Sequence, residues 1–349
     1  MRLFLVLFAF VAAALGQAAQ PLRLEKTIEL PEVQGRIDHL SVDVKGQRLF
    51  VSALGNNTVE VIDLKAAKRL KTIGGLREPQ GVLYVPATDR LYVANAKDGS
   101  VQVFDGSSYA LIKTLDYGDD ADNLRYDAGR KRIYVGYGGG ALGEIDEENN
   151  KAGEIKLDAH PESFQLEKDS PRIYVNLPGS RKVAVLDREK RAVIATWSTG
   201  IALSNYPMAL DQASHRLFVI TRLPARLLVF DTNSGQVVQR LTAVGDCDDV
   251  FYDQTRKRIY TIGGEGSIYV FEQQDADHYK ESTRLTTVRG HGPASFLPNL
   301  TGYSWQCAAT ETKSRQSGSM RLGDKASHLI HRKIRCTLDV DSATPLLST

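Results

Sequence analysis

A four-residue pattern recurs six times along this chain of 349 residues: arginine, an aliphatic residue, an aromatic residue, then valine or threonine. The six copies begin at Arg48, Arg90, Arg132, Arg172, Arg216 and Arg258. Their aromatic residues follow one another at intervals of 42, 42, 40, 44 and 42 residues. A period of this length indicates that each copy belongs to one structural unit packed against its neighbours, so the repeat restricts the fold more than composition does.

Each repeat contains four short apolar runs. The pattern itself is the second run, and the third ends in an acidic residue, as in 61–63 and 103–105. A first run such as 40–43 precedes the pattern, and a fourth such as 70–73 closes the repeat. Runs rich in β-branched and aromatic residues, separated by Gly, Asn and Asp, predict four antiparallel strands per repeat. Four strands in about 40 to 45 residues are typical of a β-propeller blade.

We therefore predict an all-β protein, a seven-bladed β-propeller over residues 22–300. Six blades are complete, one for each copy of the pattern. Residues 22–28 resemble a fourth strand that precedes the first repeat, and residues 296–300 resemble a first strand with no repeat after it. The seventh blade is predicted to be split between these two segments and truncated. Sharing one blade in this way removes an exposed sheet edge.

An acidic residue precedes the repeated arginine by five positions in five of the six copies. These pairs are Asp43 and Arg48, Asp127 and Arg132, Glu167 and Arg172, Asp211 and Arg216, and Asp253 and Arg258. We expect each pair to bridge the turn between the first two strands, at about 0–1 kcal/mol for a surface ion pair. Residues that recur in nearly every blade are expected to serve the architecture.

The N-terminal segment resembles a signal peptide over residues 1–16. Arg2 is followed by an apolar run over residues 3–15, and Ala14-Leu15-Gly16 fits a cleavage site. An uncleaved membrane anchor is the alternative, although the run is short for a transmembrane helix. The mature protein is expected to be periplasmic or secreted, monomeric and without a membrane span. A net charge of +2 argues against binding nucleic acid by charge, and three cysteines exclude a disulfide scaffold.

Residues 301–349 break the repeat. The next copy of the pattern is due near residue 302, where Thr-Gly-Tyr-Ser-Trp-Gln-Cys stands instead, and no convincing strand pattern follows. Codons chosen for those seven residues, read from the third base, encode Arg-Leu-Phe-Val-Ala-Val, the missing second strand. We hypothesise that this tail is translated out of frame; a disordered C-terminal extension is the alternative. The nucleotide sequence around Thr301 tests the hypothesis.

Polar residues gather where each repeat enters its first strand. In a propeller these positions surround the mouth of the central channel, and here they differ from blade to blade while the framework repeats. The loops between the second and third strands add polar residues, including Arg222, to the same face. We predict ligand binding at this channel mouth by Asp38, His39, Gln80, Asn123, His160, Glu162, Asn205, Asp248, Asp249 and His291.

The residues of this mouth bear on three specific chemistries: metal binding, haem binding and acid–base catalysis. Its histidines and carboxylates suit a divalent cation, but no HxH or HExxH spacing supports one, so no metal ligand is assigned. His39 or His160 as a haem ligand is disfavoured, and covalent c-type haem is excluded by the absence of CxxCH. Asp248 and Asp249 as general acid and base are disfavoured because adjacent strand residues point to opposite faces. No catalytic residue is assigned, and no cofactor is firmly implied.

The repeat as a whole resembles a known group. Arg90-Leu-Tyr-Val-Ala-Asn95 and its counterparts look like the YVTN-type repeat, and the segments 35–39, 120–123, 160–162 and 245–246 are similar to YncE-like exported bacterial propellers. The resemblance covers residues 22–300 and implies the fold, but it implies little about function. More distant relatives in fold include the haem-carrying propeller of nitrite reductase, quinoprotein dehydrogenase subunits and lactonases, and none of their diagnostic sites maps onto this sequence.

The sequence thus favours an exported binding module that recognises a small ligand or an exported protein partner at the channel mouth, without a defined catalytic activity. A lactonase-like or metal-assisted hydrolase and a haem-binding redox accessory propeller are the alternatives. Whether the protein is an enzyme stays open at this point.

Overall fold

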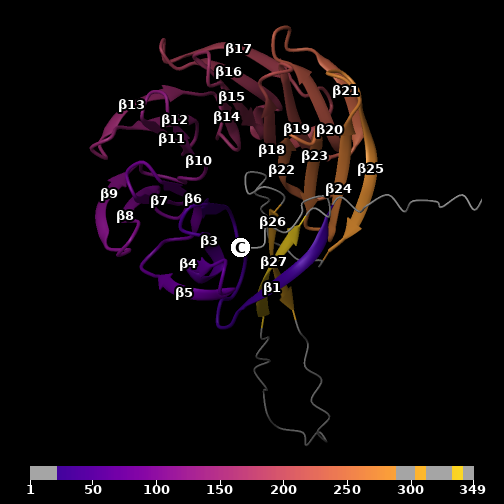
Figure 1. The fold of residues 1–349 in the computed structure, drawn as a ribbon. Helices are drawn as coiled ribbons and strands as arrows, with labels where there is room; N and C mark the ends of the chain where they lie inside the picture. The colour runs from indigo at the N-terminus through magenta and orange to yellow at the C-terminus, as the bar shows by residue number, and fades with distance from the viewer. Residues whose placement is uncertain (1–21, 288–302, 312–331, 341–349) are drawn as a thin grey trace, which may run out of the picture.

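The computed structural model describes residues 22–287, 303–311 and 332–340, and the chain forms an all-β propeller. Four-stranded antiparallel sheets stand around a centre, with their first strands innermost (Figure 1). The first three blades, from the innermost strand outward, are β2 (Leu40–Asp43), β3 (Arg48–Ala53), β4 (Thr58–Asp63) and β5 (Lys68–Ile73); β6 (Pro79–Val85), β7 (Arg90–Asn95), β8 (Ser100–Asp105) and β9 (Leu111–Asp116); and β10 (Leu124–Asp127), β11 (Arg132–Tyr137), β12 (Ala141–Ile145) and β13 (Lys151–Lys156).

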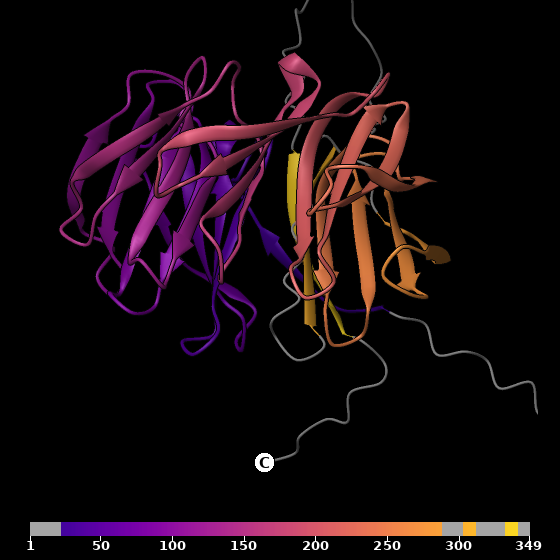
Figure 2. The ribbon, with the colours of Figure 1, turned by 90° about the horizontal axis from the view of Figure 1, so that it is seen from above.

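The other three blades have the same order. They are β14 (Phe164–Leu166), β15 (Arg172–Leu177), β16 (Lys182–Asp187) and β17 (Ala192–Ser198); β18 (Leu203–Asp211), β19 (Arg216–Leu223), β20 (Ala225–Asp231) and β21 (Val237–Thr242); and β22 (Cys247–Asp253), β23 (Arg258–Gly263), β24 (Ser267–Gln273) and β25 (Tyr279–Thr286). Single turns of 3-10 helix, η1 (Leu54–Asn56) and η2 (Pro178–Ser180), follow β3 and β15. The strands run between two opposite faces, where the loops lie (Figure 2). No helix in the described part of the chain is long and apolar enough to cross a membrane.

The prediction of seven blades is wrong, because the described residues form six four-stranded blades. The remaining sheet has three strands, in the order β1 (Arg23–Leu30), β27 (Arg332–Val340) and β26 (Tyr303–Glu311). It lies between the first and the sixth blade (Figure 1). Its two C-terminal strands fall in the segment where no strand pattern was found, and the expected inner strand at 296–300 lies outside the described residues. The strand expected at 22–28 corresponds to β1, but β26 and β27 could not be foreseen, because no copy of the pattern falls in them.

The N-terminal strand connects the cores of the first and last blades. Ile28 and Leu30 of β1 are buried in a cluster with Leu49 of the first blade. Leu22, just before β1, packs with Tyr260 and Ile262 of the sixth blade. Each apolar side chain buried in this way stabilises the fold by about 1.5–3 kcal/mol. The segment 22–30 therefore closes the ring by apolar contact with both neighbouring blades.

The aromatic residue of the repeated pattern packs toward the next blade. Phe50 of the first blade is fully buried in a cluster with Val82 and Leu91 of the second. Tyr134 of the third blade packs in the same way against Phe164 and other residues of the fourth. All six pattern aromatics are at most 2% exposed. The pattern repeats because each blade needs one large apolar side chain to fill the space before its neighbour.

The repeated acidic residue caps a turn more often than it pairs with the repeated arginine. Asp43 does both: its Oδ1 accepts a hydrogen bond from Gly46 N at 2.9 Å, and its Oδ2 lies 2.7 Å from Arg48 Nη2. Asp127, by contrast, caps through Arg130 N at 3.1 Å and forms an ion pair with Arg188 at 3.2 Å. The expected bridge within the hairpin therefore forms in the first blade, whereas the turn cap is the more general role of the acid.

Candidate functional site

The inner strands begin with a local irregularity that turns side chains toward the channel mouth. In the first blade, Asp38 N donates to the carbonyl of Ser52 at 2.8 Å, and Ser52 N donates to the carbonyl of His39 at 3.0 Å. Two successive residues therefore oppose one residue of β3, which is the arrangement of a β-bulge. The same pairing places Asp122 and Asn123 around Gly136, and Glu162 and Ser163 around Asn176.

The sixth blade has a register shift at the same place, between Cys247 and Asp249 of β22. The shift frees Asp248 from regular alternation. Both Asp248 and Asp249 consequently line the same cavity, although regular strand geometry predicts opposite faces. Bulges commonly re-aim side chains in this way beside functional sites.

A cavity of about 450 Å³ lies at the channel mouth, between the starts of the inner strands. Its size is within the range of small-molecule sites. Eight of the ten residues predicted from the sequence line it: Asp38, His39, Gln80, Asn123, His160, Glu162, Asp248 and Asp249. Asn205 does not; it is buried, and its Nδ2 donates to Asn176 Oδ1 at 3.0 Å and to the Lys182 carbonyl at 2.9 Å. His291 lies outside the described residues.

Other residues of the lining were not among the predicted site residues. They are Arg36, Asp120, Asp122, Ser163, Tyr206, Pro207, Arg222 and Asp246. Most of them lie within two or three residues of a predicted residue, so nearness in the sequence to a predicted residue could have identified them. Asp38 with His39 and Asp248 with Asp249 were predicted as whole pairs, whereas Asp122 and Ser163 were passed over beside Asn123 and Glu162.

The cavity is strongly acidic. Seven carboxylates line it, against the two guanidinium groups of Arg36 and Arg222. Arg36 Nη2 lies 2.6 Å from Asp38 Oδ2, and Arg222 contacts Asp248 and lies 3.4 Å from Asp246 Oδ1. Both arginines are therefore engaged by acids of the first and sixth blades. A cleft lined by charge of one sign concentrates ions of the other sign.

Burial and mutual repulsion raise the pKa of several of these carboxyl groups. The pKa of Asp122 is well above its usual range, first because the group is buried and then because Glu162 and Asp38 lie nearby. Burial, followed by the charges of Asp38 and Asp120, raises the pKa of Glu162 to about 7. Burial also raises the pKa of Asp248 to about 6, against the opposing effect of Arg222. These carboxyl groups therefore keep their protons to a higher pH than ordinary carboxyl groups do.

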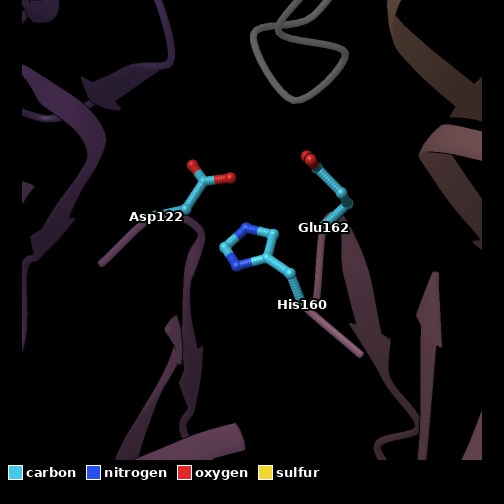
Figure 3. Close-up of side chains that lie close together, drawn as sticks. All are labelled: Asp122, His160 and Glu162. Atoms are coloured by element: carbon cyan, nitrogen blue, oxygen red, sulfur yellow. The ribbon is translucent and has the colours of Figure 1, made fainter. Parts of the chain in front are cut away.

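Three of these side chains come together from the third and fourth blades. One ligand atom each of Asp122, His160 and Glu162 lies within 4.8 Å of the others, and the three side chains face a common space (Figure 3). Nδ1 of His160 is 2.7 Å from the carbonyl oxygen of Gly138. Imidazole and carboxylate together are donors that divalent transition metals accept. No metal ligand was predicted from the sequence, because contacts between blades leave no spacing motif.

His39 stands beside this group. Its Nε2 lies 3.7 Å from Oδ1 of Asp38 and 3.7 Å from Oδ1 of Asp122. Burial lowers the pKa of His39, although Asp38 opposes that effect. Burial therefore favours the neutral form of this imidazole, which lies between the two carboxylates.

Comparisons with known proteins show structural likeness to other β-propellers and sequence similarity over a short part of the chain. No family model matches the chain. Over 97 residues the chain is 31% identical to the uncharacterised protein YncE of Salmonella typhi and 30% identical to YncE of Salmonella typhimurium. The chain is a β-propeller with partial similarity to YncE. Each alignment covers 28% of this chain and 27% of the relative, so it spans about a quarter of the proteins it matches.

Solved structures share the architecture at low identity. A chain of hydrazine synthase from Kuenenia stuttgartiensis superposes with a TM-score of 0.67 and 18% identity, over 76% of this chain and 91% of that one. A chain of a mitotic checkpoint complex superposes with a TM-score of 0.72 and 12% identity, over 88% of this chain and 95% of that one. At these identities the likeness shows the propeller fold alone.

Proposed function

We propose that the protein is an exported binding module that captures a small, positively charged ligand at the mouth of its channel. The observation that carries this proposal is the charge of the cavity, where seven carboxylates face two arginines. Both arginines are already engaged by acids of the first and sixth blades. The acids of the third and fourth blades are therefore available to bind a cation.

The size and depth of the cavity support a small ligand. A volume of about 450 Å³ is within the range of small-molecule sites. Asp122 is almost fully buried at its wall, so a cation bound there would interact with a poorly hydrated carboxylate. Attraction between opposite charges is stronger in such a place than at an exposed surface. A ligand with one to three ammonium groups fits this chemistry.

Thermal shifts with matched probes test the proposal. Putrescine and spermidine serve as cations, triethylene glycol as a neutral compound of similar length and citrate as an anion, all with a chelator present. We expect the two amines to raise the melting temperature and the other probes to leave it unchanged. Asp120→Asn, which removes a lining acid that leads into the third blade, should reduce the amine-induced shift, whereas Glu147→Gln, in an exposed turn on the opposite face, should not. An equal shift with citrate, or shifts with amines that survive Asp120→Asn unchanged, would refute the proposal.

The export part of the proposal rests on residues 1–16. It predicts that the protein expressed in a bacterium leaves the cytoplasm and begins at Gln17. Cell fractionation followed by N-terminal sequencing tests it. Recovery of the cytoplasmic protein with residues 2–16 still attached would count against export.

A further inference from the structure

We propose that Asp122, His160 and Glu162 form a binding site for one divalent first-row transition-metal ion at the channel mouth. This inference rests on the proposed function, because it names a cation class for part of the same cavity. The three residues come from the loops that lead into β10 and β14, in neighbouring blades. The site is therefore created by the packing of the third blade against the fourth.

The spacing of the three donors suits one ion. Their ligand atoms lie within 4.8 Å of one another. Metal–ligand bonds of about 2.0–2.2 Å place neighbouring donors roughly 3–3.5 Å apart. Asp122 is held by burial, whereas Glu162 is partly exposed and has a longer side chain that rotation can bring closer. A small movement of the Glu162 carboxylate toward the ion would bring all three donor atoms to bonding distance.

A second observation points to a missing partner. Asp122 is 3% exposed, and its Oδ1 accepts no hydrogen bond from the residues that the structure describes. Its other oxygen, Oδ2, accepts one from Asn123 Nδ2 at 3.3 Å. A buried carboxylate oxygen without a donor is uncommon and unfavourable. Because Asp122 lines the cavity, an ion bound there would satisfy this oxygen.

The hydrogen bond of His160 prepares its ring for a metal. The carbonyl of Gly138 can only accept, so Nδ1, at 2.7 Å, must carry the proton. The lone pair of a neutral ring is then on Nε2. In Figure 3 the ring nitrogen nearer the two carboxylates points toward the space between them. Metal-binding histidines commonly donate their other ring N–H to a carbonyl or carboxylate in this way.

The donor set selects the class of ion. One imidazole with two carboxylates suits zinc, manganese, cobalt or iron better than calcium or magnesium, which prefer oxygen donors alone. Three protein ligands leave at least one coordination position open toward the cavity. Water or a donor atom of a second ligand can occupy that position.

Cobalt(II) alone is the probe for the test. Chelator-treated protein is titrated with cobalt chloride while visible absorption and binding heat are recorded. We expect one ion per chain and an absorption change that saturates at that ratio. A twofold excess of calcium should leave the signal intact. Failure to saturate at one ion per chain, or displacement of cobalt by equimolar calcium, would overturn the assignment.

Conservative variants locate the ion. Asp122→Asn, His160→Gln and Glu162→Gln should each weaken cobalt binding by at least about tenfold. Glu147→Gln is the matched control and should bind cobalt like the unmodified protein. Circular dichroism confirms that each variant is folded. Three folded variants with unchanged affinity would refute the site.

A measurement on the unmodified protein avoids any folding defect. Bound Mn²⁺ should broaden the ring resonances of His160. It should leave those of His278, an exposed histidine in the turn between β24 and β25, sharp. Equal broadening of both rings would overturn the proposal. The amine screen contains chelator and the cobalt titration contains no amine. Either test can therefore fail while the other succeeds, which separates this inference from the proposed function.

Discussion

The Nδ1 atom of His160 lies 2.7 Å from the carbonyl oxygen of Gly138. Gly138 belongs to the loop between β11 and β12 of the third blade, and His160 to the loop that leads into β14 of the fourth. One hydrogen bond therefore ties two blades together and orients the imidazole. A loop of the third blade therefore positions a side chain of the fourth.

The first prediction concerns the tautomer of that ring. Because a carbonyl cannot donate, we expect neutral His160 to carry its proton on Nδ1. Long-range nitrogen–proton NMR spectra at mildly alkaline pH distinguish the two tautomers. His278 is a useful internal comparison, because its Nδ1 faces the carboxylate of Asp275 in an exposed turn. A proton on Nε2 of His160 would contradict the structure.

The second prediction concerns the pH dependence of stability. The pKa of Glu162 is about 7 in the folded protein and ordinarily 4.5, so the folded state binds a proton that the unfolded chain releases. Stability should therefore fall as the pH rises from about 4.5 to about 7. Glu162→Gln cannot titrate and should make this decline shallower. Urea unfolding at about pH 5 and about pH 8, with chelator present, measures it; an unchanged decline would argue against a raised pKa.

The third prediction compares two arginines at the same place in the repeat. Arg48 is mostly buried, pairs with Asp43 and donates to Tyr109 Oη at 2.9 Å. Arg132 donates to the carbonyl of Lys131 at 3.3 Å and forms no ion pair within the described residues. Removing one partner of a largely buried pair costs about 2–4 kcal/mol, whereas an exposed contact contributes about 0–1 kcal/mol. Arg48→Ala should lower the free energy of unfolding more than Arg132→Ala, and equal losses would refute the distinction.

The fourth prediction concerns Gly81 in β6. A Cβ atom added there would lie 2.0 Å from the carbonyl oxygen of Asp122 in the next blade. Backbone cannot yield cheaply, so Gly81→Ala should destabilise the protein by about 1–3 kcal/mol and displace Asp122. Gly139→Ala meets nothing within 4 Å and should be tolerated. Thermal unfolding compares the two; a harmless Gly81→Ala would mean that the second and third blades are less closely packed.

The framework could be predicted from the sequence because its cause is local and repeated. Each blade needs an aromatic such as Phe50 or Tyr134 to fill the space before the next blade, and this requirement leaves a period of about 42 residues. Strand order within a blade follows from short turns between adjacent runs. The blade number could not be obtained in the same way. It depends on how β1, β26 and β27 pair across the ends of the chain, and those strands carry no repeat.

For the site, too, some features followed from the sequence and others depended on tertiary contacts. The sequence by itself determined that polar residues such as Asp38, His39 and Asp249 gather at one mouth, because antiparallel strands bring every inner strand's start to the same face. Tertiary structure alone decided that Asp122 meets His160 and Glu162 there. A bulge reverses the alternation at Asp122, and the packing of two blades brings together residues nearly forty positions apart. Neither the bulge nor the contact has a local sequence signal, because both depend on the strand or blade alongside.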